Sequence, residues 1–125
     1  MRETMRRLPD AELEVMQALW RFTPPVSRGD MEAVLSQTHP MAQTTLLTLL
    51  TRLSEKGFVQ IEKQGRTSVY TPLVAKEDYL ASQSKRFVEQ LCGGSISTFA
   101  AALCGSGISR EDLAELRDLL ERDAL

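Results

Sequence analysis

The sequence predicts a mainly α-helical fold that carries one small β-hairpin. Two observations lead to this class. Apolar residues recur at intervals of three and four up to residue 53 and again beyond residue 74, which is the spacing of an α-helix. Between these regions, "FVQIEKQGRTSVYTPL" is rich in β-branched and aromatic residues, as strands are. The chain has 125 residues, 42% of them hydrophobic and 26% charged, which suffices for one core or two small ones.

The first two helices are predicted from their apolar spacing and their ends. In "DAELEVMQALW", Asp10 and Glu12 lie near the positively polarised end of the first helix. "FTPPV" ends that helix, because proline donates no amide hydrogen and restricts the residue before it. Ser27 then caps a second, short helix that ends by His39-Pro40. The predicted apolar sides comprise Leu13, Met16, Leu19 and Trp20 in the first helix and Met31, Val34 and Leu35 in the second.

The third predicted helix, "AQTTLLTLLTRL", has one charged residue, Arg52, and a row of threonines. With its leucine stripe set at zero, Thr44, Thr51 and Thr48 lie at about 160°, 140° and 200°, opposite the core. Glutamate or lysine would form a solvated helix better than threonine, so the repeated threonines indicate a contact surface. The glycine of "EKG" ends the helix. The stripe predicted to be buried comprises Leu46, Leu49, Leu50 and Leu53.

A β-hairpin is predicted on either side of Gln64-Gly65. Matching apolar residues across the two strands favours a three-residue loop, Gln64 to Arg66. This register places Ile61 opposite Val69 and Lys63 opposite Thr67.

Three helices followed by a hairpin with an exposed tip form the layout of a winged helix-turn-helix domain, which we predict over residues 1–74. Threonine hydroxyls, the amide of Gln43 and the marginal Leu47 are able to contact base edges without any charge. Binding of the DNA phosphates requires cationic side chains. Arg52 and Arg66, each considered alone, are equally well explained as ordinary solvated surface charges. The phosphate-binding candidates are Arg28, Arg52, Lys63 and Arg66.

The remaining residues, 75–125, predict a helical dimerisation region. "KEDYLASQSKRFVEQLC" forms one helix that Gly93-Gly94 ends, and two more follow, the last capped by Ser109 with Asp112. About 50 residues make a marginal core alone, so a second copy is expected to complete it. The alternative is a monomer whose tail folds back on the winged domain. The residues expected at the dimer interface are Leu80, Phe87, Val88, Leu91, Phe99, Leu103, Leu113, Leu116 and Leu120.

Charge and cysteine content limit the remaining functions. The formal net charge is −2, but residues 1–74 hold nine basic and eight acidic residues, so only this part could present a basic face. One histidine, His39, and two isolated cysteines, Cys92 and Cys104, predict no metal site, cofactor or disulfide framework, and we interpret both cysteines as small core residues. No stretch suits a membrane span or signal peptide, so the expected location is cytoplasmic.

Several of these segments resemble the penicillinase-repressor family of bacterial transcription regulators, of the BlaI and MecI type. "LPDAELEVMQALW", "TLLTRLSEKGFV", "CGGSISTFAAAL" and "SREDLAELRDLL" carry the resemblance, which extends from about Leu8 to Glu121. It implies a homodimeric winged-helix repressor that binds a dyad operator. It also implies cleavage within the C-terminal region that depends on a membrane sensor metallopeptidase.

The resemblance also assigns positions. The base-reading and phosphate positions of the family fall on Thr44, Thr45, Leu47 and Thr48, with Thr44 and Leu47 standing where the best-known members have lysine and arginine. The cleavage region falls near Ala102-Leu103 without the Asn-Phe pair of the resistance repressors, which puts a β-lactam trigger in question.

The sequence thus predicts a DNA-binding repressor rather than an enzyme, since one histidine and no cluster of acids leave no evident catalytic set. The alternative is a winged-helix protein-interaction module whose Thr/Leu face docks a protein instead of DNA.

Overall fold

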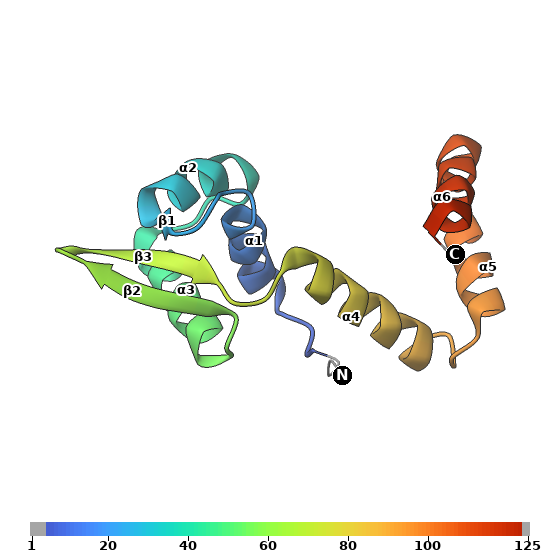
Figure 1. The fold of residues 1–125 in the computed structure, drawn as a ribbon, viewed down its shortest axis with the longest axis horizontal. Coiled ribbons are helices and arrows are strands. Elements are labelled where there is room, and N and C mark those ends of the chain that lie inside the picture. Colours follow the sequence, from blue (N-terminus) through green and yellow to red (C-terminus); the bar gives the residue numbers. More distant parts are fainter. Residues whose placement is uncertain (1–4, 124–125) are drawn as a thin grey trace. The chain divides into compact units, whose positions relative to one another are not determined.

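The computed structural model describes residues 5–123 and confirms a mainly helical chain with one small sheet (Figure 1). Within these residues, no helix combines the length and the apolar character needed to cross a bilayer. The elements are, in order, α1 (Asp10–Leu19), β1 (Val26–Ser27), α2 (Arg28–Thr38), α3 (Gln43–Glu55), β2 (Val59–Gln64), β3 (Thr67–Pro72), α4 (Lys76–Gln90), α5 (Ile96–Gly105) and α6 (Arg110–Asp123).

Two compact units make up the chain, and the division between them falls after Gln83, within α4. The sequence boundary predicted after Val74 lies earlier. The first part of α4 therefore packs with the elements before it.

The core of the first unit lies among α1, α2, α3 and the base of the sheet. Ser27 caps α2 as predicted, since its hydroxyl accepts a hydrogen bond from the Asp30 amide at 3.1 Å. The buried side of α1 differs from the prediction, because Leu13 and Trp20 are only partly buried. The side chains that α1 buries are Glu12, Val15, Met16, Ala18 and Leu19.

The sheet has the strand order β1-β3-β2 and is antiparallel throughout. β1 was not predicted from the sequence. It has only two residues, Val26 and Ser27, which pair with Tyr70 and Val69. β1 joins the segment before α2 to the hairpin, and Val26 is fully buried there.

The predicted hairpin register was wrong by one residue. Gln64 pairs with Thr67 and Ile61 pairs with Tyr70, so the loop is the two residues Gly65 and Arg66. Gly65 has a φ of +65°, and glycine with positive φ at the first loop position suits a two-residue turn that follows the twist of the strands. The turn sets the register here. Ile61 lies on the exposed part of the hairpin, so an apolar partner opposite it would stabilise the sheet only slightly.

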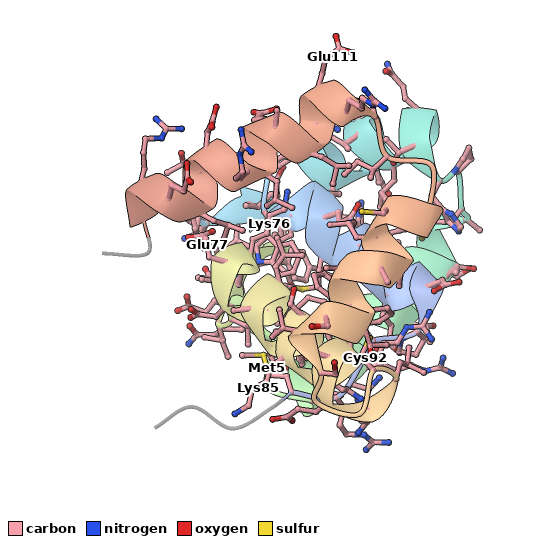
Figure 2. The ribbon with its side chains drawn as sticks, turned by 90° about the vertical axis from the view of Figure 1, so that its right-hand side faces the viewer. Met5, Lys76, Glu77, Lys85, Cys92 and Glu111 are labelled. Carbon is pink, nitrogen blue, oxygen red and sulfur yellow. The ribbon has the colours of Figure 1, made fainter. Side chains whose placement is uncertain are left out.

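The start of α4 is fixed to the first unit by Tyr79, whose side chain is 3% exposed. Its ring lies 6.0 Å from that of Trp20 and 5.9 Å from that of Phe58, measured between centroids. Its hydroxyl accepts a hydrogen bond from the Leu8 amide at 2.9 Å. Met5 lies beside the same helix (Figure 2) and its amide donates to Ser82 Oγ at 2.6 Å. The chain before α1 and the first turns of α4 therefore stabilise each other.

This packing predicts how the chain tolerates truncation. A fragment that ends after Gln83 keeps Tyr79, whereas one that ends after Val74 loses it and opens the core beneath Trp20 and Phe58. We expect the shorter fragment to be less stable by about 3 to 5 kcal/mol, as for deletion of a large buried aromatic side chain. Urea unfolding of the two fragments measures the difference, and equal midpoints and slopes would contradict it.

The second unit, from Ser84, contains the end of α4 with α5 and α6. Gly93 and Gly94 end α4 with φ values of +62° and +80°, and Cys92 at this turn (Figure 2) is buried as predicted. Cys104 is exposed on α5, so the prediction of a core residue was wrong there. Phe87 packs edge-on against Phe99 at 5.8 Å between ring centroids. Ser109 caps α6 as predicted, since its hydroxyl accepts from the Asp112 amide at 3.0 Å. Neither α5 nor the described part of α6 buries any side chain fully.

Candidate nucleic-acid interface

The orientation of α3 follows from its leucines. Leu46, Leu49, Leu50 and Leu53 are all buried, with at most 6% of any side chain exposed. They meet α1 and the base of the hairpin in the core. Burial of each such side chain stabilises the fold by about 1.5 to 3 kcal/mol, so this side of α3 is firmly held inward, as predicted.

The opposite side of α3 is open. Thr44, Thr48 and Thr51 are exposed, which confirms the geometry predicted for them, and Gln43 is exposed at the start of the helix. Thr45 is exposed as well, and Leu47 is half-buried at the margin of this side. The predicted base-reading side chains thus all belong to the first two turns of α3, and all but Leu47 are exposed.

Two hydroxyls on this surface bond to the helix itself. Thr48 Oγ1 donates to the carbonyl oxygen of Thr44 at 3.0 Å, and Thr51 Oγ1 donates to that of Leu47 at 3.0 Å. Threonine commonly makes such bonds within helices. Both hydroxyls therefore keep only their lone pairs for an outside partner.

The predicted phosphate-binding cations come from three elements. Arg52 is exposed in the last turn of α3, and Lys63 and Arg66 are exposed on the β2-β3 hairpin, whose tip extends away from the helices (Figure 1). Arg28 begins α2 and is half-exposed, with its Nε 3.5 Å from Glu32 Oε2. The Nε atom is buried although the rest of the side chain is partly exposed, so a phosphate group would bind Arg28 through its terminal guanidinium nitrogens. The ion pair with Glu32 itself contributes little.

An ion pair that was not predicted from the sequence supports α3 on its buried side. Glu12 of α1 is 3% exposed, and its Oε1 lies 2.5 Å from Nζ of Lys56, the residue that follows α3. In the sequence, Glu12 has the ordinary appearance of an acidic residue in the first turn of a helix. Only the packing of α1 against α3 reveals that this carboxylate holds the end of α3.

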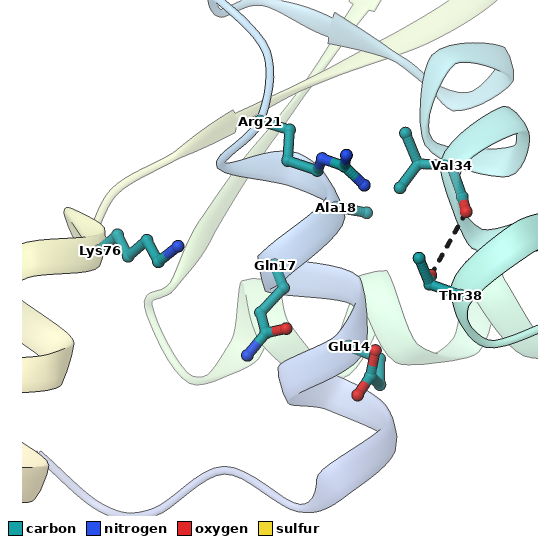
Figure 3. A pocket seen from close by; sticks show the side chains of 7 residues that line it. All are labelled: Glu14, Gln17, Ala18, Arg21, Val34, Thr38 and Lys76. Carbon is teal, nitrogen blue, oxygen red and sulfur yellow. Dashed lines mark hydrogen bonds between the residues drawn. The ribbon is translucent and has the colours of Figure 1, made fainter. Parts of the chain in front are cut away.

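A hollow of about 260 Å³ lies elsewhere in the first unit (Figure 3). Carboxylate, ammonium and guanidinium groups line it together, and none of the predicted DNA-contacting residues does. It is therefore not part of the candidate interface. The lining residues are Glu14, Gln17, Ala18, Arg21, Val34, Thr38 and Lys76. Among residues 5–123, no group of three or more His, Cys, Asp or Glu side chains is arranged to hold a metal ion.

Comparison with known proteins identifies the family and the fold of the winged unit. The penicillinase repressor of Bacillus licheniformis is 32% identical over 121 residues, which cover 94% of each chain. The methicillin resistance regulatory protein MecI of Staphylococcus aureus strain N315 is 27% identical over 116 residues, or 92% of this chain and 94% of that protein. The solution structure of monomeric Bacillus licheniformis BlaI in complex with the blaP half-operator is 35% identical. It covers 63% of this chain and 94% of that one, with a TM-score of 0.51. The family described as penicillinase repressor matches residues 8–122, and the chain belongs to this family of transcriptional repressors with winged-helix DNA-binding domains.

Proposed function

We propose that this protein is a homodimeric, sequence-specific repressor that occupies a dyad operator. The observation that carries the proposal is the two-sidedness of α3, with leucines packed inward and a threonine and glutamine surface left open. A helix of this kind fits the major groove, where uncharged side chains are able to read base edges. The membership of this protein in the penicillinase-repressor family supports the same role.

In this mechanism, affinity and specificity come from different side chains. The first turns of α3 contact the bases through Gln43, Thr44, Thr45, Leu47 and Thr48. Arg28, Arg52, Lys63 and Arg66 neutralise phosphates on either side of the groove. The bound protein then represses by blocking access to the promoter.

Dimerisation is proposed for the second unit because a single copy leaves much apolar surface uncovered. Leu91 is 73% exposed, Leu120 59% and Phe87 40%. A second copy would bury these side chains and bring two α3 helices about one DNA turn apart, roughly 34 Å. The proposed interface also includes Leu80, on the part of α4 that belongs to the first unit. Its residues in the second unit are Phe87, Val88, Leu91, Phe99, Leu103, Leu113, Leu116 and Leu120.

Relief of repression is proposed to act on the same unit, by cleavage near Ala102-Leu103 or by another signal. The proposed partner for cleavage is a membrane sensor metallopeptidase. Ala102 is exposed and Leu103 half-buried, and both lie inside α5. A protease binds an extended peptide, so cleavage there requires α5 to unwind locally first. Because α5 buries no side chain fully, the free energy required to unwind it locally is low.

Selection of duplexes from a randomised DNA pool by the purified full-length chain tests the proposal. We expect the enriched sequences to be inverted repeats, because a two-fold symmetric dimer presents two identical α3 helices. Their half-site centres should lie about 10 to 10.5 base pairs apart, or a multiple of that spacing. Enrichment of single, non-palindromic sites would contradict the dimer, and enrichment of no sequence would contradict specific DNA binding.

A further inference from the structure

The hydroxyl of Thr48 is restricted in what it is able to bind. Its Oγ1 lies 3.0 Å from the carbonyl oxygen of Thr44. A carbonyl oxygen carries no proton, so the hydroxyl must be the donor in this bond, and a hydroxyl has only one proton to donate. The side chain is exposed, and what it offers to a partner is its lone pairs and its methyl group.

Duplex DNA has few groups that are able to bond to such lone pairs. In the major groove the donors are the N6 amino group of adenine and the N4 amino group of cytosine. The N7 and O6 atoms of guanine, the O4 atom of thymine and the phosphate oxygens are all acceptors. Two acceptors facing each other repel, so the bond inside the helix decides which base edges Thr48 tolerates.

We propose that Thr48 determines operator specificity as a hydrogen-bond acceptor that recognises the amino group of an adenine or a cytosine. This inference rests on the proposed function. Operators that place a guanine or thymine edge opposite Thr48 are therefore expected to bind more weakly. To contact those edges, the hydroxyl would first have to give up its bond to Thr44, at a cost of about 2- to 12-fold in affinity.

Neighbouring threonines differ in this respect and provide internal comparisons. Within residues 5–123, the Thr44 hydroxyl has no hydrogen-bond partner, so it remains free to donate or accept. Thr51 has the same internal bond as Thr48, to the carbonyl of Leu47. It lies three residues further along α3, beyond the first turns that recognition helices bring to the bases. Thr51 thus controls for removal of the internal bond alone.

The test pairs side-chain changes with changes of single base atoms. The probe is a duplex selected from a randomised pool by the full-length wild-type chain. Each adenine is replaced in turn by purine, which lacks the N6 amino group, and each cytosine by 2-pyrimidinone, which lacks the N4 amino group. The affinities of wild type, Thr48→Val, Thr48→Ser and Thr51→Val are measured for every duplex. Comparing variants on the same pair of duplexes cancels the effect of a base analogue on the duplex itself.

At one position in each half-site, removal of the amino group should weaken wild-type binding about 3- to 10-fold. The same removal should leave Thr48→Val unaffected, because valine keeps the shape of threonine but has no acceptor. Thr48→Ser and Thr51→Val should keep the wild-type loss. Thermal melts of the variants check that the fold is intact.

Two results would overturn the inference while leaving the proposed function standing. In one, Thr48→Val binds every duplex as wild type does, which would mean that the hydroxyl contacts no base. In the other, the effect of Thr48→Val disappears on duplexes with 7-deazapurines, which lack the N7 acceptor, so that the hydroxyl is a donor. Failure of the wild-type chain to enrich any duplex would instead overturn the proposed function, and this inference with it.

Discussion

Leu50→Ala is expected to lower the free energy of unfolding by about 2 to 5 kcal/mol. Leu50 is 1% exposed on the inner side of α3, and its removal would leave a cavity among α1, α3 and the sheet. Because the loss is one of packing, it should appear in the absence of DNA. Urea unfolding monitored by circular dichroism measures it.

The neighbouring residue is the matched control. Thr51 lies on the exposed side of the same helix, so Thr51→Ala should change the free energy of unfolding by no more than about 0.5 kcal/mol. Equal losses for the two variants would mean that α3 does not have one buried and one open side.

Raising the salt concentration from about 50 to 200 mM should weaken operator binding by roughly 10³- to 10⁵-fold. The four candidate cations, Arg28, Arg52, Lys63 and Arg66, would give the proposed dimer about eight phosphate contacts. Each contact releases counterions, and this makes the logarithm of affinity fall steeply with the logarithm of salt concentration. Fluorescence anisotropy of a labelled operator over a salt series gives the slope.

Single substitutions refine this test. Arg66→Ala should reduce the slope by roughly one for each contact that the dimer loses, and it should affect operator and random DNA alike. Lys85→Ala is the matched control, because Lys85 is exposed on the part of α4 that belongs to the second unit and is not a candidate for phosphate contact. A shallow slope for wild type would favour the alternative of a protein-interaction module, because docking through the Thr/Leu surface releases few ions.

Elements that depend only on residues close together in the sequence were predicted correctly. The leucine spacing of α3, its glycine stop and the Ser27 and Ser109 caps each depend on residues within a few positions of one another, and the structure has all of them. The open threonine side followed from the same helical geometry.

Features that depend on distant residues were missed. β1 is too short to show a pattern and exists because β3 lies beside it. The Glu12–Lys56 pair joins residues 44 positions apart, so no local signal marks it. The hairpin register depended on the preference of Gly65 for positive φ, which outweighed the apolar matching used to predict it.

The role of the first turns of α4 was also hidden. The predicted apolar side of this helix began with Leu80, which is 51% exposed, whereas the residue beside it, Tyr79, is buried. Tyr79 is buried because Trp20, Phe58 and the Leu8 amide surround it, and these contacts come from three other parts of the chain. An exposed Leu80 remains consistent with its proposed place in the dimer interface.

The central claim is that the open side of α3 reads bases, and the double variant Gln43→Ala/Thr48→Ala tests it most directly. Its affinity for the selected operator and for random DNA is compared with that of wild type under identical salt. We predict that discrimination between the two DNAs falls by about 1 to 3 kcal/mol for each good base contact removed, while the thermal melt is nearly unchanged. An equal loss of affinity for both DNAs, with discrimination intact, would contradict the claim.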